Sequence, residues 1–215
     1  MRDIAVYGAG GLGREILTLI KDINVVCPSW NVLGFLDDGH PIGDLVNGHK
    51  VLGNIDDLNS WDKPLSIVIA NGDPQIKRRI VGKIDNSHVC YPTLIHPSAI
   101  IGDTNFVSFG KGCIICAGNI ITTNIRFHDF VTLNLACTVG HNAVIGRYTS
   151  IMPAVNISGE VTVGEAVYLG TGAKIINRIA VGDNTIVGAG AVVAKDLPSD
   201  CTAVGVPAKP IKFNK

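Results

Sequence analysis

An apolar residue recurs at every sixth position over more than a third of the chain, from Phe109 to Val193. Hydrophobic residues make up 47% of the sequence, so composition alone does not produce an unbroken series of this length. The residue after the apolar position is often glycine, and a second series of small or branched residues follows four positions after it. The apolar series is Phe109, Ile115, Ile121, Phe127, Leu133, Val139, Ile145, Ile151, Ile157, Val163, Leu169, Ile175, Val181, Val187 and Val193.

A period of six fits neither an α-helix nor a simple alternating strand. It is typical of short strands wound into a coil, in which each strand sends one aliphatic side chain inward before the chain turns. Stacked coils would form ladders of Ile, Val and Leu, and burial of each side chain is worth roughly 1.5–3 kcal/mol. We expect glycine or asparagine where the turns need a positive φ. Upstream, Ile95 and Ile101 keep the period, which slips by two residues before Phe109.

Residues 1–92 follow a different pattern. The apolar run that begins at Ile4 leads into Gly8, Gly10, Gly11 and Gly13, and helical spacing follows from Arg14 to Ile23. Strand, glycine loop and helix in this order are typical of a phosphate-binding turn, where glycine allows close backbone approach and the helix supplies N–H groups. The glycines can also serve only to make a tight turn.

Two further apolar strands are predicted in the same region, at Val32–Leu36 and Ser66–Ala70, and a helix is predicted from about Pro74 to Ile84. The first strand ends at Asp37, a carboxylate that can accept from a ribose hydroxyl or a base N–H, and the second ends at Asn71. About 90 residues hold one βαβαβ half, whereas a dinucleotide usually spans two. The sequence therefore favours a small Rossmann-like domain for a mononucleotide, such as the nucleoside diphosphate of an activated sugar, over a nicotinamide dehydrogenase.

Charge and cysteine content exclude several classes of function. Lys and Arg together number 18 and Asp and Glu also 18, so no excess of basic residues indicates binding to nucleic acid or an anionic membrane. No secretory signal or membrane-spanning stretch is recognisable, and the scattered cysteines indicate reduced thiols in a cytoplasmic protein. Cys113 and Cys116 form a lone C-x-x-C pair, which we interpret as buried small residues, and no metal site is predicted.

Motifs along nearly the whole chain resemble one family when they are taken in order. They are the glycine loop near residue 8, Phe35-Leu36-Asp37-Asp38, Ile95-His96-Pro97-Ser98-Ala99, Val139-Gly140-His141 and Val204-Gly205-Val206-Pro207-Ala208-Lys209. The chain is similar to the bacterial sugar O- and N-acyltransferases with hexapeptide repeats, which include sialic-acid O-acetyltransferases and pilin-glycan amino-sugar N-acetyltransferases. This resemblance implies an α/β plus all-β protein, in which a left-handed parallel β-helix over residues 93–215 follows the first domain. It also implies coils of about 18 residues, five to six of them in this chain, and a homotrimer with acetyl-CoA between neighbouring β-helices.

The resemblance also assigns roles to particular residues. His141 matches the family's catalytic base, and Gly159, one coil further on, matches a backbone N–H that contacts the acetyl group. Thr171 and Ala189 would lie along the pantetheine arm of acetyl-CoA, and Lys209 near its adenine end. The acceptor is expected to reach His141 from the first domain of the same subunit.

The chemistry explains a histidine at position 141. An amine or hydroxyl that attacks a thioester loses a proton as the bond forms, and a neutral imidazole can take it. Such general-base catalysis typically raises the rate by about 10²–10⁴-fold. The family often has an acidic residue directly after the base, and this chain has Asn142, which can hydrogen-bond the ring but would stabilise the imidazolium less. Leu12 and Ser150 also replace histidines found in relatives.

Two other functions remain open at this point. The missing acidic partner is compatible with a trimeric β-helix that binds nucleotide sugars without acyl transfer. A zinc enzyme of the carbonic anhydrase type would need three converging histidines, and only His128 and His141 lie in the regular repeats, with His96 near their start. The sequence does not decide between amine and hydroxyl acceptors, although we favour the amine, and it leaves open the sugar, the nucleotide and the acyl chain length.

Overall fold

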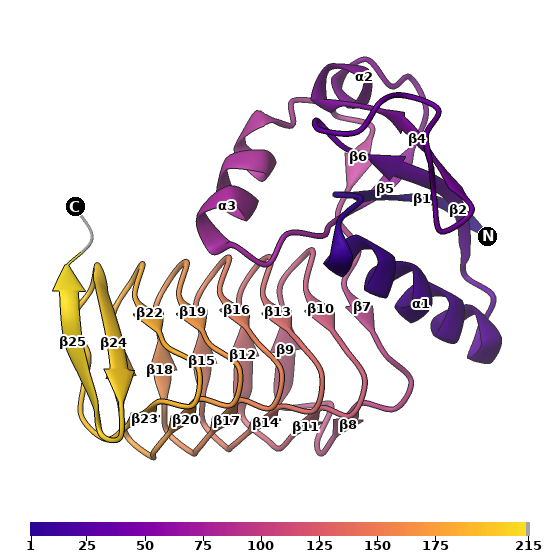
Figure 1. Ribbon diagram of the computed structural model, residues 1–215. Helices are drawn as coiled ribbons and strands as arrows, with labels where there is room; N and C mark the ends of the chain where they lie inside the picture. The colour runs from indigo at the N-terminus through magenta and orange to yellow at the C-terminus, as the bar shows by residue number, and fades with distance from the viewer. Residues whose placement is uncertain (214–215) are drawn as a thin grey trace.

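The computed structural model describes residues 1–213, which form an α/β part and a long coil of short strands (Figure 1). The α/β part contains one six-stranded sheet in the order β3-β4-β2-β1-β5-β6. In it β1 pairs in parallel with β2 and β5, and β3 pairs antiparallel with β4. Its elements are β1 (Arg2–Tyr7), α1 (Gly11–Val26), β2 (Trp30–Leu36), β3 (Leu45–Val46), β4 (His49–Gly53), α2 (Ile55–Asn59), β5 (Leu65–Ile69), α3 (Pro74–Lys83) and β6 (Val89–Cys90).

The strongly patterned elements of this part agree with the sequence, and the short ones were missed. Helices α1 and α3 and strands β1, β2 and β5 lie within a few residues of the predicted segments. The hairpin of β3 and β4, the helix α2 and the edge strand β6 were not predicted. These elements have two to five residues each, too few for a hydrophobic period to reveal them. In α2, Asn54 and Asp57 form a reciprocal capping box.

The coil is a parallel β-helix with three faces, through which the chain passes in the order 1, 2, 3. Face 1 contains β7 (Leu94–Ile95), β10 (Ile114–Ile115), β13 (Thr132–Leu133), β16 (Ser150–Ile151), β19 (Tyr168–Leu169), β22 (Ile186–Val187), β24 (Cys201–Gly205) and β25 (Ala208–Phe213). Face 2 contains β8 (Ile100–Ile101), β11 (Ile120–Ile121), β14 (Thr138–Val139), β17 (Asn156–Ile157), β20 (Lys174–Ile175) and β23 (Val192–Val193). Face 3 contains β9 (Val107–Phe109), β12 (Ile125–Phe127), β15 (Val144–Ile145), β18 (Thr162–Val163) and β21 (Ala180–Val181).

The strand register confirms the predicted repeat. Ile115 pairs with Leu133, eighteen positions further along the chain, and this interval continues through the regular coils. Ile101 instead pairs with Ile121, twenty positions on, so the predicted slip is a two-residue insertion in the first coil. From Ile115 to Val193 every member of the apolar series is at most 2% exposed. The interior of the β-helix is therefore the expected aliphatic ladder.

The expectation of glycine or asparagine where φ is positive is confirmed only in part, since Gly112, Gly118, Gly172, Gly190, Asn124, Asn142 and Asn184 occupy such corners but other residues share them. The positive φ occurs two residues after the usual glycine position, and it is adopted there by Phe130, Tyr148, Glu160 and Arg178 as well as by asparagine, with φ near 60°. The glycines that directly follow the apolar positions are needed for another reason, because adjacent coils approach closely there. A Cβ on Gly140, for instance, would lie 2.7 Å from the backbone nitrogen of the next coil.

The α/β part packs against face 1 of the β-helix, as Figure 1 shows. Ile16 and Leu19 of α1 share a hydrophobic cluster with Leu94 and Ile114 of face 1. The ring of Phe130, where the chain passes from face 3 to face 1, stacks on Tyr148 with centroids 5.4 Å apart and meets Tyr91 edge to face with centroids 5.0 Å apart. The edge between faces 2 and 3 lies on the opposite side of the three-sided coil.

Candidate active site

His141 and Gly159 lie in neighbouring coils on the edge between faces 2 and 3, as the sequence predicted for this pair. The imidazole of His141 rests directly against the backbone of Gly159. A Cβ added to Gly159 would lie 2.6 Å from Nε2 and 2.7 Å from Cε1 of this ring, well inside van der Waals contact. Only glycine at position 159 therefore allows the ring to occupy this place.

Both groups have free polar atoms. His141 is exposed, and within residues 1–213 neither nitrogen of its ring has a hydrogen-bond partner. The Gly159 N–H is likewise unpaired among the described residues, while the Gly159 carbonyl accepts from Arg178 N at 3.1 Å. An imidazole and an unpaired N–H donor thus lie side by side on the surface. The imidazole can accept a proton, and the N–H can donate a hydrogen bond to a developing oxyanion.

The expected contact between Asn142 and the imidazole is not present. Asn142 has φ of 61°, and its backbone N–H donates to the carbonyl of Thr123 at 3.2 Å. Its conformation is that of the corner residue found in each coil, which Glu160 adopts one coil further on. Within residues 1–213 no hydrogen bond joins the Asn142 side chain to the imidazole, so this residue does not orient His141 within one chain.

The residues expected to bind the coenzyme do not all lie with His141. Thr171 and Ala189 occupy successive coils on the edge between faces 1 and 2, a different edge from that of His141. Lys209 is exposed on β25, the last strand of face 1. The period of six places every third turn on the same edge, and Thr171 is five turns after His141, which explains the mismatch. Within one chain these three residues do not form a single row with His141.

The four glycines of the first loop serve different purposes. Gly8 has φ of 110°, and a Cβ there would lie 2.8 Å from the carbonyl oxygen of Ala70. A Cβ on Gly13 would collide with the carbonyl oxygen of Gly8. These two glycines are required by packing within the loop, whereas Gly10 and Gly11 face open space at the start of α1.

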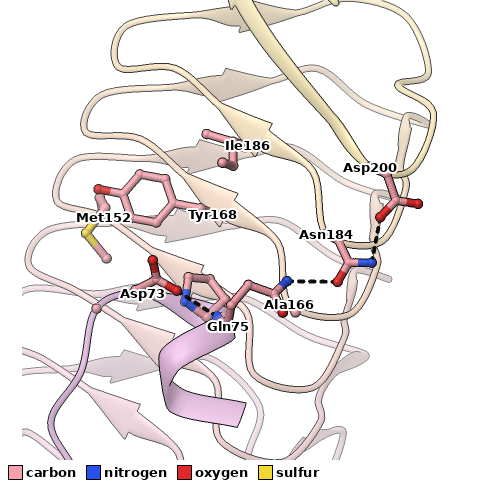
Figure 2. Close-up of a pocket in the computed structure, with 10 residues that line it drawn as sticks. Asp73, Gln75, Met152, Ala166, Tyr168, Asn184, Ile186 and Asp200 are labelled. Atoms are coloured by element: carbon pink, nitrogen blue, oxygen red, sulfur yellow. Dashed lines mark hydrogen bonds between the residues drawn. The ribbon is translucent and has the colours of Figure 1, made fainter. Parts of the chain in front are cut away.

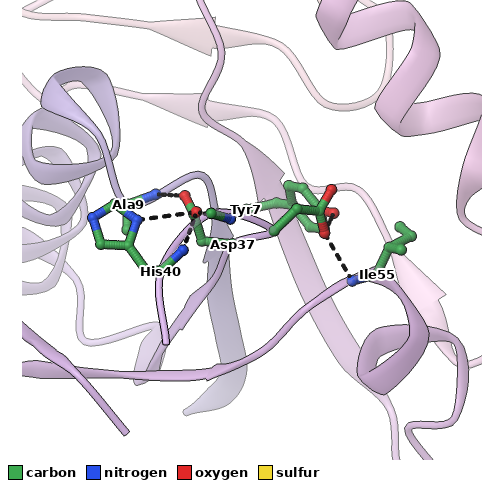
Figure 3. A network of polar contacts seen from close by, with 7 residues as sticks. Tyr7, Ala9, Asp37, His40 and Ile55 are labelled. Carbon is green, nitrogen blue, oxygen red and sulfur yellow. Dashed lines mark hydrogen bonds and ion pairs between the residues drawn. The ribbon is translucent and has the colours of Figure 1, made fainter. Parts of the chain in front are cut away.

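The Asp37 carboxylate holds the glycine loop rather than pointing free into solvent (Figure 3). Its Oδ2 accepts from Ala9 N at 2.7 Å, and its Oδ1 accepts from Gly39 N at 2.8 Å and lies 3.0 Å from Nδ1 of His40. Burial raises the pKa of Asp37, but the hydrogen bonds from Ala9, His40 and Gly39 outweigh it and leave the pKa below its ordinary value of 3.8. A ribose hydroxyl or base N–H that binds to Asp37, as the sequence predicts, would therefore compete with these internal hydrogen bonds.

Asp38 also has a structural contact that the sequence did not indicate. Its Oδ1 accepts from the Tyr7 hydroxyl at 2.8 Å and from Ile55 N at 3.1 Å, so it is not simply a solvated turn residue. Burial, followed by the hydrogen bond to Asp38, raises the pKa of Tyr7 above its ordinary value, and the phenol stays protonated. Together Asp37 and Asp38 fix the ends of β1, β2 and α2 relative to one another.

A cavity of about 340 Å³ lies at the carboxyl ends of β1, β2 and β5, the usual ligand-binding edge of such a sheet. Among the predicted residues it is lined by Gly8, Asp37 and Asn71. Arg79 and Lys83 of α3 also line it, and both can approach phosphate groups. Sequence reasoning missed them, although they lie one helical turn apart on the predicted helix, which was a usable signal. We call this space the loop cavity.

A second and larger cavity, of about 760 Å³, lies between the start of α3 and the β-helix (Figure 2). We call it the seam cavity. Gln75 reaches across to the β-helix, where its Nε2 donates to Asn184 Oδ1 at 2.9 Å, and Asn184 Nδ2 donates to Asp200 Oδ1 at 2.9 Å. None of its residues was predicted, because contacts across more than 100 positions leave no local pattern. It is lined by Gly72, Asp73, Pro74, Gln75, Met152, Ala166, Tyr168, Asn184, Ile186 and Asp200.

The expectation that His141 receives its acceptor from the α/β part of the same chain is not met. The loop cavity and the seam cavity both lie on the side of face 1, and His141 lines neither of them. In a three-sided coil, the edge between two faces lies opposite the remaining face. His141 is on the edge between faces 2 and 3, so it lies opposite face 1. Within one chain the β-helix itself separates the imidazole from both cavities.

The cysteines and histidines show no arrangement for metal binding in the described part of the chain. No group of three or more His, Cys, Asp or Glu side chains there is placed to hold a metal ion. Burial raises the pKa of Cys113 to about 11 and that of Cys116 to about 12, as expected for buried protonated thiols. His96 lies 3.0 Å from Asp22 of α1 through Nε2, and its Nδ1 accepts from Ser98 N. No helix within residues 1–213 is long and apolar enough to cross a bilayer.

Comparison with known proteins identifies the family. Residues 3–84 match the family model of the PglD N-terminal domain. GDP-perosamine N-acetyltransferase of Escherichia coli O157:H7 is 33% identical over 173 residues, which span 79% of this chain and 76% of that protein. PerB from Caulobacter crescentus, solved with CoA and GDP-perosamine, superposes with a TM-score of 0.87 at 28% identity over 99% of this chain and 98% of PerB.

A third comparison is with the acetyltransferase domain of PglB from Neisseria gonorrhoeae in complex with acetyl coenzyme A. It gives a TM-score of 0.87 at 32% identity, and it covers 98% of this chain and 99% of that one. The expected fold, a Rossmann-like α/β region followed by a left-handed parallel β-helix, is confirmed. The chain therefore belongs to the bacterial sugar acyltransferase family of hexapeptide-repeat proteins, and within that family it is an acetyltransferase.

Proposed function

We propose that this protein transfers the acetyl group of acetyl-CoA to the amino group of a nucleotide-linked sugar, with His141 as general base. The pairing of an unobstructed imidazole with the free N–H of Gly159 carries the proposal. The relatives described above support both substrates, since one is named a GDP-perosamine N-acetyltransferase and PerB was solved with CoA and GDP-perosamine. Acetyl-CoA and reduced thiols such as Cys113 suit a cytoplasmic location.

The two cavities offer room for the two ends of the sugar nucleotide. Asn71 lines the loop cavity and the next residue, Gly72, lines the seam cavity, so the spaces adjoin at the connection between β5 and α3. Arg79 and Lys83 suit the diphosphate in the loop cavity. The sugar would then lie against Tyr168 in the seam cavity. In this proposal residues 1–92 bind the nucleotide and residues 93–215 perform the transfer.

The proposed reaction is a direct attack without an acyl-enzyme. The sugar amine attacks the thioester carbonyl carbon while Nε2 of His141 takes the proton that the nitrogen loses. The Gly159 N–H donates to the carbonyl oxygen as it becomes negative, a contribution of the kind worth about 10²–10³ in rate. The tetrahedral intermediate then expels the CoA thiolate, which receives the proton from the imidazolium and leaves as the thiol. A bond from nitrogen to the acetyl carbon forms, and the carbon–sulfur bond breaks.

Because His141 lies across the β-helix from its own cavities, the site is complete only between subunits. We infer a homotrimer in which the edge carrying His141 and Gly159 faces the seam cavity of a neighbouring copy. Acetyl-CoA would lie in the groove between the two copies. In that arrangement Thr171, Ala189 and Lys209, which lie apart from His141 within one chain, are candidates for coenzyme contacts across the groove.

The test measures thiol release from acetyl-CoA with a panel of GDP-, UDP-, CMP- and dTDP-linked amino sugars and their hydroxyl counterparts. We expect turnover with an amino sugar, and a loss of about 100-fold or more in kcat for His141→Ala with unchanged unfolding temperature. Near-normal turnover in that variant removes His141 from the mechanism. Saturable sugar binding without any thiol release from the unaltered protein would instead favour the non-catalytic binder, for which the missing partner of His141 is the supporting observation.

A further inference from the structure

A lysine is completely buried where α3 meets the β-helix. Lys77 is 1% exposed, and its Nζ donates to the Phe130 carbonyl at 3.0 Å, to Thr132 Oγ1 at 2.9 Å and to Ser150 Oγ at 2.9 Å. Thr132 and Ser150 are themselves at most 1% exposed. All three acceptors belong to the β-helix, whereas the lysine belongs to the α/β part. A single side chain thus joins the two parts through three hydrogen bonds in a dry environment.

The charge of this lysine has no carboxylate partner within salt-bridge distance in the described chain. Burial lowers the pKa of Lys77 to about 7, and Cys113 and Asp73 oppose that change only in part. An ammonium matches the three acceptors with its three N–H groups. A neutral amine also fits, because the hydroxyl of Thr132 or Ser150 can rotate and donate to its lone pair. The cluster can therefore hold Lys77 in either protonation state.

The location of these contacts relates them to both cavities. Thr132, Ser150, Tyr168 and Ile186 are successive rungs on the outer side of face 1, so Lys77 is fastened one rung from Tyr168 in the wall of the seam cavity. Gln75, two residues before Lys77, lies in the opposite wall of that cavity. The width of the seam cavity depends on how closely α3 approaches face 1.

The same helix also bounds the loop cavity. Ile76, Arg79, Ile80 and Lys83 line the loop cavity from one side of α3, while Lys77 is buried on the other side. A shift of α3 would therefore move the proposed phosphate contacts and the proposed sugar contacts together. Burying an ammonium that has no counter-ion is costly compared with an apolar side chain of similar volume, so stability alone does not account for Lys77.

We propose that Lys77 is a positioning residue that holds α3 at a fixed height above face 1 and thereby aligns the loop cavity with the seam cavity for one sugar nucleotide. The sugar nucleotide in this inference rests on the proposed function, whereas the hydrogen bonds of Lys77 do not depend on it. A buried hydrogen-bonded clamp suits this task better than apolar packing, because three directional bonds fix both the position and the rotation of the helix.

The kinetic test compares Lys77→Met with Lys63→Met, a control that removes an exposed lysine from the same part of the protein. We expect Lys77→Met to raise KM for the sugar nucleotide about tenfold, with kcat at saturating sugar and KM for acetyl-CoA within about twofold of the unaltered protein. Lys63→Met should match the unaltered protein. An unchanged KM for the sugar in a folded Lys77→Met variant would overturn the proposal. So would a fall in kcat accompanied by equal rises in KM for the sugar and KM for acetyl-CoA.

A second variant and a second readout keep the inference testable if Lys77→Met does not fold or no sugar turns over. Ser150→Ala removes one acceptor and leaves the lysine, so KM for the sugar should rise about threefold. Hydrogen exchange of the α3 amides should become faster in either variant and remain unchanged in Lys63→Met. If the unaltered protein shows no turnover but the α3 amides exchange faster in the variants, the proposed function has failed while the positioning role of Lys77 stands. Unchanged exchange in Ser150→Ala and Lys77→Met refutes the clamp.

Discussion

The imidazole of His141 occupies space that any side chain at Gly159 would need, since a Cβ there would lie 2.6 Å from Nε2. The two residues are eighteen positions apart and are brought together by one turn of the β-helix. The glycine thus determines both the ring position and the access to its own N–H.

Gly159→Ala should therefore displace the ring and shield the N–H at once. We expect kcat to fall by about 10²–10³, the loss typical of a missing oxyanion donor, while the unfolding temperature changes little because the site is at the surface. Gly82→Ala is the matched control, since Gly82 is exposed in α3 with no atom near its missing Cβ. A Gly159→Ala enzyme with full kcat would mean that the ring is not needed where it lies.

Asn142 should matter less than a catalytic residue does. Its conformation belongs to the corner of the coil, and Ala136 and Ala154 adopt the same positive φ at the corresponding turn position on another edge. We expect Asn142→Ala to keep kcat within about threefold and to cost less than about 1 kcal/mol in the free energy of unfolding. Steady-state kinetics and urea unfolding test this together, and a 100-fold loss of kcat would restore the catalytic role that the sequence indicated.

Gly13 and Gly11 should respond in opposite ways to alanine. Gly13→Ala forces a collision with the Gly8 carbonyl, and we expect a loss of about 1–3 kcal/mol in unfolding free energy. Gly11→Ala has open space and should leave stability unchanged. Its effect would be weaker binding of the sugar nucleotide if phosphate approaches the start of α1, which isothermal titration can measure. Equal stability of the two variants would contradict the packing role of Gly13.

Asp37 should make the α/β part sensitive to acid. Its pKa is lower in the folded state than in the unfolded chain, so its stabilising effect is complete above about pH 4 and is lost as the pH falls through the folded value. Asp37→Asn cannot accept from Ala9, Gly39 and His40 in the same way, and we expect it to cost about 1–3 kcal/mol at pH 7. The difference in unfolding free energy between the two proteins should shrink on acidification, and a constant difference down to pH 3 would argue against this role.

Lys77 should make the free energy of unfolding increase with pH above neutrality. Its folded pKa of about 7 lies below the ordinary value of 10.5, so between these pH values the unfolded chain binds more protons. The unfolding free energy of the unaltered protein should therefore rise relative to Lys77→Met, by up to about 1.4 kcal/mol per pH unit. Parallel denaturant curves at pH 6, 8 and 9.5 measure this, and parallel pH dependences in the two proteins would show that the lysine is not buried in solution.

The sequence was most informative where structure repeats or where a motif is local. The hexad series predicted the ladder from Ile115 to Val193, and the spacing of eighteen placed Gly159 beside His141. The seam cavity could not be predicted, because Gln75 and Asn184 meet only through the docking of two separately patterned regions. Nothing in the sequence singled out Lys77, because only the packing of α3 against face 1 buries it. The roles of Thr171, Ala189 and Lys209 stay predictions.

The placement of the α/β part on face 1 has a consequence for how this enzyme would come to be active. A protomer that has folded correctly still holds its two cavities and the imidazole of His141 on opposite sides of the β-helix. Under the proposed function, competence would then arise on association rather than on folding, and activity per chain would fall when the protein is diluted below the concentration at which its subunits remain together.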